Sequence, residues 1–290
     1  MIELDNIRFC YRRKGLPALD GVTATLDPGI YLLAGENGAG KTTLLHIIAG
    51  VARPASGTCR IDSLDPASDN PAEKGNIFML EENMRVPAKT IRKFAEIHSR
   101  FYPDFSAERF LANLVTFGLS GDEKLTSLSF GNHKKSLLAY ALALGVDVLL
   151  LDEPTNGLDI QSKESLRRMI AECTSDHQTV IVATHSFNEL DKLFDGAMIM
   201  EKSHLLYAAT EDDTVGALAF RTRRNPAENA LYYETVPGGA LCIEPADGDD
   251  EPTRVDWRLL YSALHSPRRD ALLGYLTKRK ALRTDNSMTD

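Results

Sequence analysis

Short apolar runs rich in Val, Ile and Leu recur along the first two thirds of the chain, and stretches with helical spacing separate them. Runs of this kind are typical of strands buried in a mixed α/β sheet. The pattern predicts strands at about 2–9, 22–26, 30–34, 57–61, 76–80, 147–152, 179–183 and 196–200. It predicts helices at about 41–50, 89–101, 106–117, 131–145, 160–174 and 187–194. Residues 87–145 have almost no strand signal, so we expect a helical subdomain there.

The pattern changes past about residue 210. The runs LYYET and ALCIE flank the turn sequence VPGG, which predicts a small β-hairpin. The helical spacing of Trp257, Leu260 and Leu264 predicts a helix after it. We therefore expect a main domain at 1–215 and a small α+β accessory region at 216–290, which either packs on the main domain or regulates it.

Composition narrows the class of protein. The 290 residues are enough for about two domains, and 43% hydrophobic with 26% charged residues excludes a disordered chain. A net charge of −8 argues against non-specific nucleic-acid binding. The four cysteines form no CxxC pair, which argues against a zinc site or a disulfide framework. The longest apolar run, Leu137–Val146, has about half the length that a bilayer requires, so we expect a cytoplasmic protein with no membrane span of its own.

The sequence GENGAGKTT directly follows the strand expected at 30–34 and fits the phosphate-binding pattern GxxxxGK[ST]. Lys41 would add a positive charge for the β- and γ-phosphates at the N-terminus of a helix, which itself attracts anions. Thr42 would offer a hydroxyl to Mg²⁺. Three glycines let the backbone bend and bring amide N–H groups against phosphate oxygens: Gly35, Gly38 and Gly40.

A second motif, VDVLLLDEP, is a buried-strand run that delivers two carboxylates to the end of the sheet where ligands bind in α/β proteins. Asp152 would hold Mg²⁺ through its water shell. Glu153 would polarise the attacking water as a general base does.

These motifs resemble those of the ATP-binding-cassette (ABC) ATPases. LSFGN at Leu128–Asn132 is similar to the LSGGQ signature of that family, and the resemblance implies that Ser129 and the amide of Gly131 bind the γ-phosphate held by a partner protomer. By the same resemblance, Asp159 in NGLD is the D-loop acid, His185 is the switch histidine and Tyr11 stacks on adenine. The nucleotide-binding set it implies is Tyr11, Gly35, Asn37, Gly38, Gly40, Lys41, Thr42, Thr43, Ser129 and Gly131.

The resemblance covers about residues 1–210 and implies a P-loop NTPase core with an antiparallel β subdomain and a helical subdomain. It implies an ATPase that uses ATP and Mg²⁺, pairs with a second cassette and drives a separate membrane permease from the inner face of the cell membrane. The run FYPDF and the single cassette are similar to bacterial exporter ATPases. The alternative is a soluble ABC ATPase that regulates or assembles another protein without transport.

Three positions depart from the family pattern. Glu81 stands where we place the Q-loop glutamine, and as a possible Mg²⁺ ligand it predicts tighter metal dependence and slower turnover. Phe130 replaces a signature glycine and Asn132 replaces the signature glutamine. The altered signature is compatible with a homodimer or with a heterodimer, and the transported substrate is not encoded in a cassette.

Overall fold

The computed structural model describes residues 1–12, 15–68, 76–84, 86, 89–186, 190, 192–246 and 253–287, with side chains up to residue 279. The chain divides into two compact units, Met1–Tyr207 and Ala208–Asp290. The structural division falls within strand β9 (His204–Thr210), whereas the boundary expected from the sequence, between residues 215 and 216, falls after helix α6 (Glu211–Val215).

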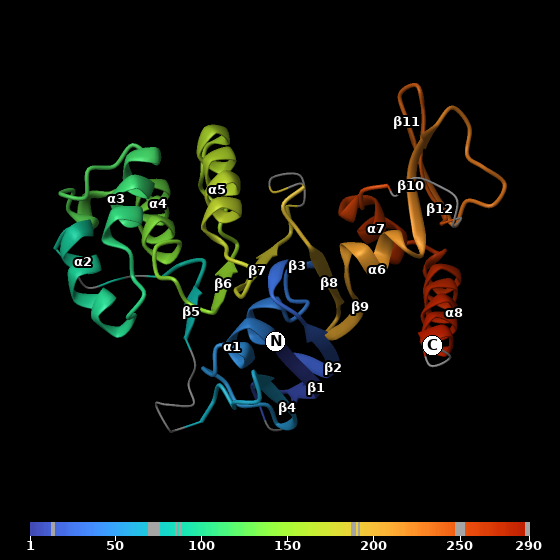
Figure 1. Ribbon diagram of the computed structural model, residues 1–290, viewed down its shortest axis with the longest axis horizontal. Helices are drawn as coiled ribbons and strands as arrows, with labels where there is room; N and C mark the ends of the chain where they lie inside the picture. Colours follow the sequence, from blue (N-terminus) through green and yellow to red (C-terminus); the bar gives the residue numbers. More distant parts are fainter. Residues whose placement is uncertain are drawn as a thin grey trace. The chain divides into compact units, whose positions relative to one another are not determined.

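The core of the first unit is a six-stranded sheet with the order β5-β6-β7-β3-β8-β9 (Figure 1). The pairs from β5 to β8 are parallel, and every residue of β6 and β7 is buried. This burial on both faces explains the unbroken apolar runs in the sequence. The strands are β3 (Gly29–Gly35), β5 (Ile77–Leu80), β6 (Val148–Asp152), β7 (Thr179–Thr184), β8 (Gly196–Glu201) and β9.

A separate antiparallel sheet has the order β2-β1-β4. Its strands are β1 (Ile2–Phe9), β2 (Leu19–Leu26) and β4 (Ser56–Ile61). On β2, every second residue from Val22 to Leu26 is buried, and the residues between them are exposed. One face of β2 therefore packs on the protein interior.

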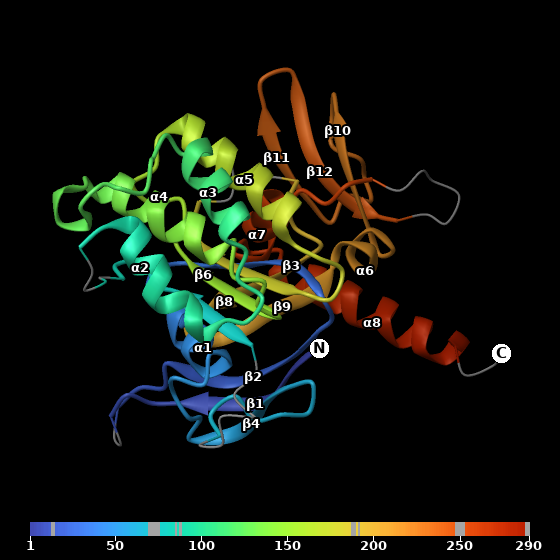
Figure 2. The ribbon, with the colours of Figure 1, turned by 60° about the vertical axis from the view of Figure 1, so that its left-hand side comes forward.

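Helix α1 (Lys41–Ile48) follows β3, and α5 (Ile160–Cys173) follows β6. The helical subdomain contains α2 (Ile91–His98), η1 (Ser99–Phe101), α3 (Ala107–Thr116), η2 (Leu125–Ser127) and α4 (Phe130–Ala141). Figures 1 and 2 show α2, α3 and α4 gathered into one layer. Their interior is aromatic, because the Tyr140 ring lies 4.8 Å from that of Phe94 and 5.6 Å from that of Phe105.

The predicted α/β class with an antiparallel and a helical subdomain is confirmed. Glycines follow two of the helices that end earlier than predicted: α1 stops at Ile48 before Gly50, whose φ is +70°, and α4 stops at Ala141 before Gly145, also at φ +70°. Strand β9 was not predicted. The helix predicted at 187–194 falls largely outside the described residues.

The second unit is α+β. Its described residues form an antiparallel sheet of order β10-β12-β11 and three helices, and the predicted hairpin is the β11–β12 pair. Its elements are α6, β10 (Leu218–Arg223), β11 (Tyr232–Val236), β12 (Gly239–Pro245), α7 (Trp257–Leu264) and α8 (Arg269–Ser287). In the described part of the chain, no helix combines the length and apolar character needed to span a bilayer.

Candidate functional site

The loop between β3 and α1 has a backbone that only glycine accommodates. Gly38 and Gly40 have φ values of +82° and +108°, a region that side chains rarely adopt. A Cβ atom at Gly40 would also lie 2.5 Å from the carbonyl oxygen of Ala18, and one at Gly35 would lie 2.8 Å from that of Met200. The predicted glycines therefore let this loop turn tightly against its neighbours before α1 begins.

Lys41, the first residue of α1, is only 6% exposed. Its Nζ donates to the carbonyl oxygens of Gly35 at 2.7 Å and Glu36 at 3.2 Å, and lies 3.8 Å from Oε1 of Glu153. Burial lowers the pKa of this lysine, and Glu153 and Asp152 act in the opposite direction. An ammonium at the N-terminus of a helix is well placed to attract a phosphate.

Thr42 and Asp152 meet at the carboxyl end of β6. The Thr42 hydroxyl donates to Oδ2 of Asp152 at 2.8 Å, and burial raises the pKa of that carboxyl. A hydroxyl and a carboxylate are hard oxygen donors, which suit Mg²⁺ when phosphates and water complete its shell. In the described part of the chain no cluster of three His, Cys, Asp or Glu residues suits a metal ion. A Mg²⁺ ion that takes part of its ligands from nucleotide phosphates does not need such a cluster.

Glu153 lies beside this pair in a constrained backbone, at φ +45°, with its N–H donating to the Ala183 carbonyl at 2.8 Å. Its Oε1 lies 2.8 Å from Nδ1 of His185, while its buried Oε2 has no hydrogen-bond partner among the residues that the structure describes. A buried carboxylate oxygen without a partner is costly and is suited to accept a proton from water. The structure thus brings Glu153 and His185 together.

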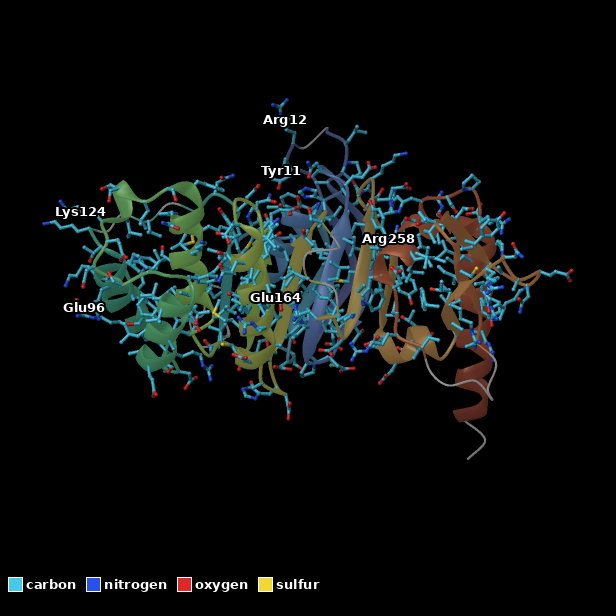
Figure 3. The ribbon with its side chains drawn as sticks, turned by 90° about the horizontal axis from the view of Figure 1, so that it is seen from above. Tyr11, Arg12, Glu96, Lys124, Glu164 and Arg258 are labelled. Carbon is cyan, nitrogen blue, oxygen red and sulfur yellow. The ribbon has the colours of Figure 1, made fainter. Side chains whose placement is uncertain are left out.

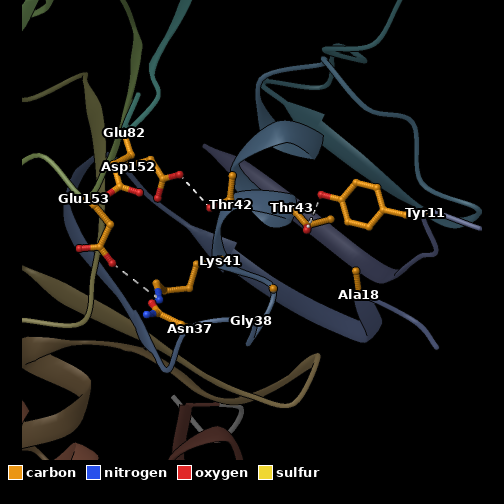
Figure 4. Close-up of a pocket in the computed structure, with 11 residues that line it drawn as sticks. Tyr11, Ala18, Asn37, Gly38, Lys41, Thr42, Thr43, Glu82, Asp152 and Glu153 are labelled. Carbon is orange, nitrogen blue, oxygen red and sulfur yellow. Dashed lines mark hydrogen bonds and ion pairs between the residues drawn. The ribbon is translucent and has the colours of Figure 1, made fainter. Parts of the chain in front are cut away.

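These residues surround a hollow of about 250 Å³ (Figure 4). Glu82, Asp152 and Glu153 lie at one end of it, and Tyr11 lies at the other. The Tyr11 hydroxyl is 2.9 Å from Oγ1 of Thr43. The residue is 67% exposed and lies at the periphery just after β1 (Figure 3). The hollow is lined by Tyr11, Ala18, Asn37, Gly38, Gly40, Lys41, Thr42, Thr43, Glu82, Asp152 and Glu153.

Glu81, the predicted Mg²⁺ ligand, has its side chain outside this hollow. Its carboxylate does not line the hollow but lies 3.1 Å from Nε2 of His46, and the side chain is half exposed. The next residue, Glu82, lines the hollow instead. Because β5 ends at Leu80, a shift of one residue in the following turn decides which glutamate faces the site.

Ser129, Gly131 and Asp159 are not among the described residues that line this hollow. Ser129 caps α4 by accepting from the Asn132 N–H at 3.3 Å, and Gly131 follows in the first turn. Asp159 caps α5, accepting from the Ser162 N–H at 2.9 Å, and its Oδ2 accepts from Lys135 Nζ at 2.8 Å. This bond from Lys135 is the main reason that the pKa of Asp159 lies well below its usual range.

Sequence reasoning missed three residues that belong to this neighbourhood. Glu82 lines the hollow, and its Oε1 accepts from Asn156 Nδ2 at 2.7 Å. Lys134 Nζ donates to the carbonyl oxygen of Glu82 at 3.0 Å. A signal for Lys134 was present, because it shares one helical stripe with Leu137, Leu138 and Ala141, where a charged residue is unusual.

Comparison with known proteins agrees with this geometry. Residues 19–156 match the family described as ABC transporter. The chain is 30% identical over 210 residues to the ABC transporter ATP-binding protein NatA of Bacillus subtilis (strain 168), covering 69% of this chain and 85% of that protein. It is 30% identical over 217 residues to the cobalt import ATP-binding protein CbiO of Syntrophus aciditrophicus (strain SB), covering 71% of this chain and 77% of that protein.

Among solved structures, the fold is similar to the dimeric, post-hydrolysis state of an ATP-binding cassette bound to ADP and Pi. The TM-score is 0.63 at 23% identity, covering 72% of this chain and 98% of that one. At this identity the likeness concerns the fold, while the sequence relatives concern the family. The chain belongs to the ABC transporter family as an ATP-binding subunit, an ATPase cassette that hydrolyses ATP for transport.

Proposed function

We propose that this chain is the ATP-hydrolysing subunit of an exporter, and that two cassettes close on ATP to drive a separate membrane permease from its cytoplasmic side. The observation that carries the proposal is the hollow that combines the glycine loop, Lys41, and the Asp152–Glu153 pair. Each group suits one part of a bound nucleotide. The loop amides and the Lys41 ammonium suit phosphates, the oxygens of Thr42 and Asp152 suit a cation, and the Glu153 carboxylate suits the attacking water.

In the proposed reaction, the loop amides and Lys41 hold the β- and γ-phosphates. Mg²⁺, held by Thr42 and Asp152, would neutralise charge on the phosphate oxygens. Glu153 polarises the attacking water, with its free Oε2 as the accepting atom. His185 holds the other oxygen of Glu153 at 2.8 Å and thereby orients that carboxylate.

The second cassette supplies what one chain lacks. Ser129 and Gly131 lie at the N-terminus of α4, a 12-residue helix, and amide groups there favour an anion. They do not line the hollow within the described part of their own chain. We therefore propose that they bind the γ-phosphate held by a partner cassette, either a second copy or a related chain.

The permease would contact the helical subdomain. A second hollow of about 580 Å³ lies between the segment after β5 and the start of α4. Much of its lining is apolar, including Met84, Val86, Leu125, Leu128 and Leu137, which suits a short amphipathic segment of another protein. The relatives include a protein named for cobalt import; export is proposed on the FYPDF run.

The test is co-fractionation with membranes. A tagged chain is expressed with and without its candidate permease, and the expected result is recovery in the membrane fraction only when the permease is present. Met84→Glu should abolish recovery, while Val51→Glu, a charge added at an exposed apolar residue outside the helical subdomain, should not. A chain that stays in the supernatant with the permease present would instead support a soluble regulator.

A further inference from the structure

Helix α4 carries a lysine in an unusual place. Lys134 is 2% exposed, and it shares the buried face of the helix with Leu137, Leu138 and Ala141. A charged side chain this deeply buried is rare and costly unless neighbouring groups compensate it. Lys134 also lines the second hollow, between the segment after β5 and the start of α4.

The ammonium of Lys134 contacts the backbone of two residues that line the ATP site. Its Nζ donates to the carbonyl oxygen of Glu82 at 3.0 Å and to that of Asp152 at 3.5 Å. Both of these residues line the nucleotide hollow. Lys134 therefore connects α4 with two separate segments that form the acidic end of the site.

The balance of charge explains why a second cation is needed there. Glu82, Asp152 and Glu153 contribute three carboxylates to the hollow, against the single ammonium of Lys41 in its lining. ATP adds further negative charge to the same space. Burial lowers the pKa of Lys134 while Glu82, Asp152 and Glu153 oppose that change, so the lysine and the carboxylates influence each other electrostatically.

We propose that Lys134 is a positioning residue of the ATPase: it offsets the negative charge of Glu82 and so permits tight ATP binding, without touching the nucleotide. Glu82 is fixed by Asn156 on its carboxylate and by Lys134 on its carbonyl. The two residues thus form a matched pair, in which the loss of the cation is harmful only while the anion remains. The proposal rests on the ATP site and is independent of the direction of transport.

A double-mutant cycle on the full-length protein tests this pairing, with fluorescent mant-ATP as the probe in the presence of EDTA. Lys134→Met should raise the dissociation constant at least tenfold. Glu82→Gln should bind as tightly as the wild type or severalfold more tightly. The double variant should return to within about threefold of the wild type. With Mg²⁺ added, ATPase assays should show the Lys134→Met effect mainly in KM.

Lys93→Met is the matched control, since Lys93 is an exposed lysine on α2 paired with Glu96, and it should bind like the wild type. Thermal unfolding identifies variants that do not fold, and Lys134→Arg, which keeps the charge, should retain most of the affinity. Wild-type affinity in Lys134→Met, no recovery in the double variant, or weaker binding by Glu82→Gln would each overturn the proposal. Failure of the wild type to bind mant-ATP would instead overturn the assignment of the site.

Discussion

Glu81 and Glu82 are neighbours in the chain but have different surroundings. Glu81 contacts His46 at the surface, whereas Glu82 lines the nucleotide hollow beside Asp152. If Mg²⁺ binds at the Thr42–Asp152 pair, we expect Glu82, which shares the lining of the hollow with that pair, to influence it more than Glu81 does.

Glu82→Gln should therefore raise the Mg²⁺ concentration for half-maximal ATPase activity severalfold, because a carboxylate binds a hard cation better than an amide does. Glu81→Gln should change that concentration by less than twofold. The measurement is an ATPase titration with Mg²⁺ at saturating ATP. Equal effects of the two substitutions would contradict the placement of Glu82.

Tyr11 offers the purine a flat, exposed ring at the far end of the hollow. Stacking of a base on an aromatic ring is worth about 1–3 kcal/mol, so Tyr11→Ala should raise the KM for ATP about tenfold with little change in kcat. Tyr11→Phe loses only the hydroxyl contact with Thr43 and serves as the control. A KM in Tyr11→Phe as high as that of Tyr11→Ala would show that the hydroxyl, and not the ring, matters.

At the scale of elements, the first turn of α4 is joined to the turn before α5. A Cβ atom at Gly131 would lie 2.7 Å from the Gly157 carbonyl oxygen, and one at Gly157 would lie 2.5 Å from two ring carbons of Phe130. Lys135 adds its ion pair with Asp159. The ring of the phenylalanine that replaces a signature glycine thus lies against the NGLD turn, although the residue is half exposed.

Gly157→Ala should destabilise the first unit by about 2 kcal/mol, from the clash with Phe130 and from the φ of +78°. In a Phe130→Ala background only the backbone penalty remains, and the same substitution should cost about 1 kcal/mol. Urea unfolding followed by circular dichroism measures both differences. An undiminished cost in the Phe130→Ala background would exclude the ring as its source.

The elements that could be predicted from the sequence are those whose burial is one-sided or complete. β6 and β7 are buried at every position and appear as unbroken apolar runs. β9 and β10 escaped prediction because neither has alternating or complete burial: most residues of β9 are partly buried, and β10 passes from buried at its start to exposed at its end. The tail of the run 131–145 is apolar because Leu142, Ala143 and Leu144 are buried, although the helix has already ended.

In the candidate site, the residues that could be predicted are those that lie together in short segments of the chain. The glycine loop, Lys41 and the Asp152–Glu153 pair were predictable, because each is formed by a short segment whose chemistry is local. Glu82 and Lys134 meet only through folding, since 52 positions separate them. Their contact depends on how α4 packs beside the end of β5, which no local pattern specifies.

At the scale of the molecule, the second unit has its own buried ion pair. Glu244 is 4% exposed, and Arg223 donates to its two oxygens at 2.8 and 2.7 Å. These hydrogen bonds are the largest cause of the lowered pKa of Glu244. The fold therefore favours its charged form, and the resulting stability is complete above the ordinary glutamate pKa of about 4.3.

Glu244→Gln should destabilise the second unit by about 2 kcal/mol at pH 7, less than a fully buried pair costs because Arg223 is partly exposed. The difference from the wild type should shrink as the pH falls below about 4, when the wild-type carboxylate is also protonated. Trp257, the single tryptophan of the chain, lies in this unit and reports its unfolding by fluorescence. A difference that is constant down to pH 3 would contradict the role of the charge.

The central claim is that two cassettes enclose ATP and that each completes the site of the other. The most direct measurement is the mass of Glu153→Gln protein, which should bind ATP and hydrolyse it poorly, by size-exclusion chromatography with light scattering. We predict a dimer with ATP and Mg²⁺ and a monomer without them, and a monomer in both conditions when Ser129→Arg is added. A Glu153→Gln chain that binds ATP and stays monomeric would contradict pairing of like cassettes.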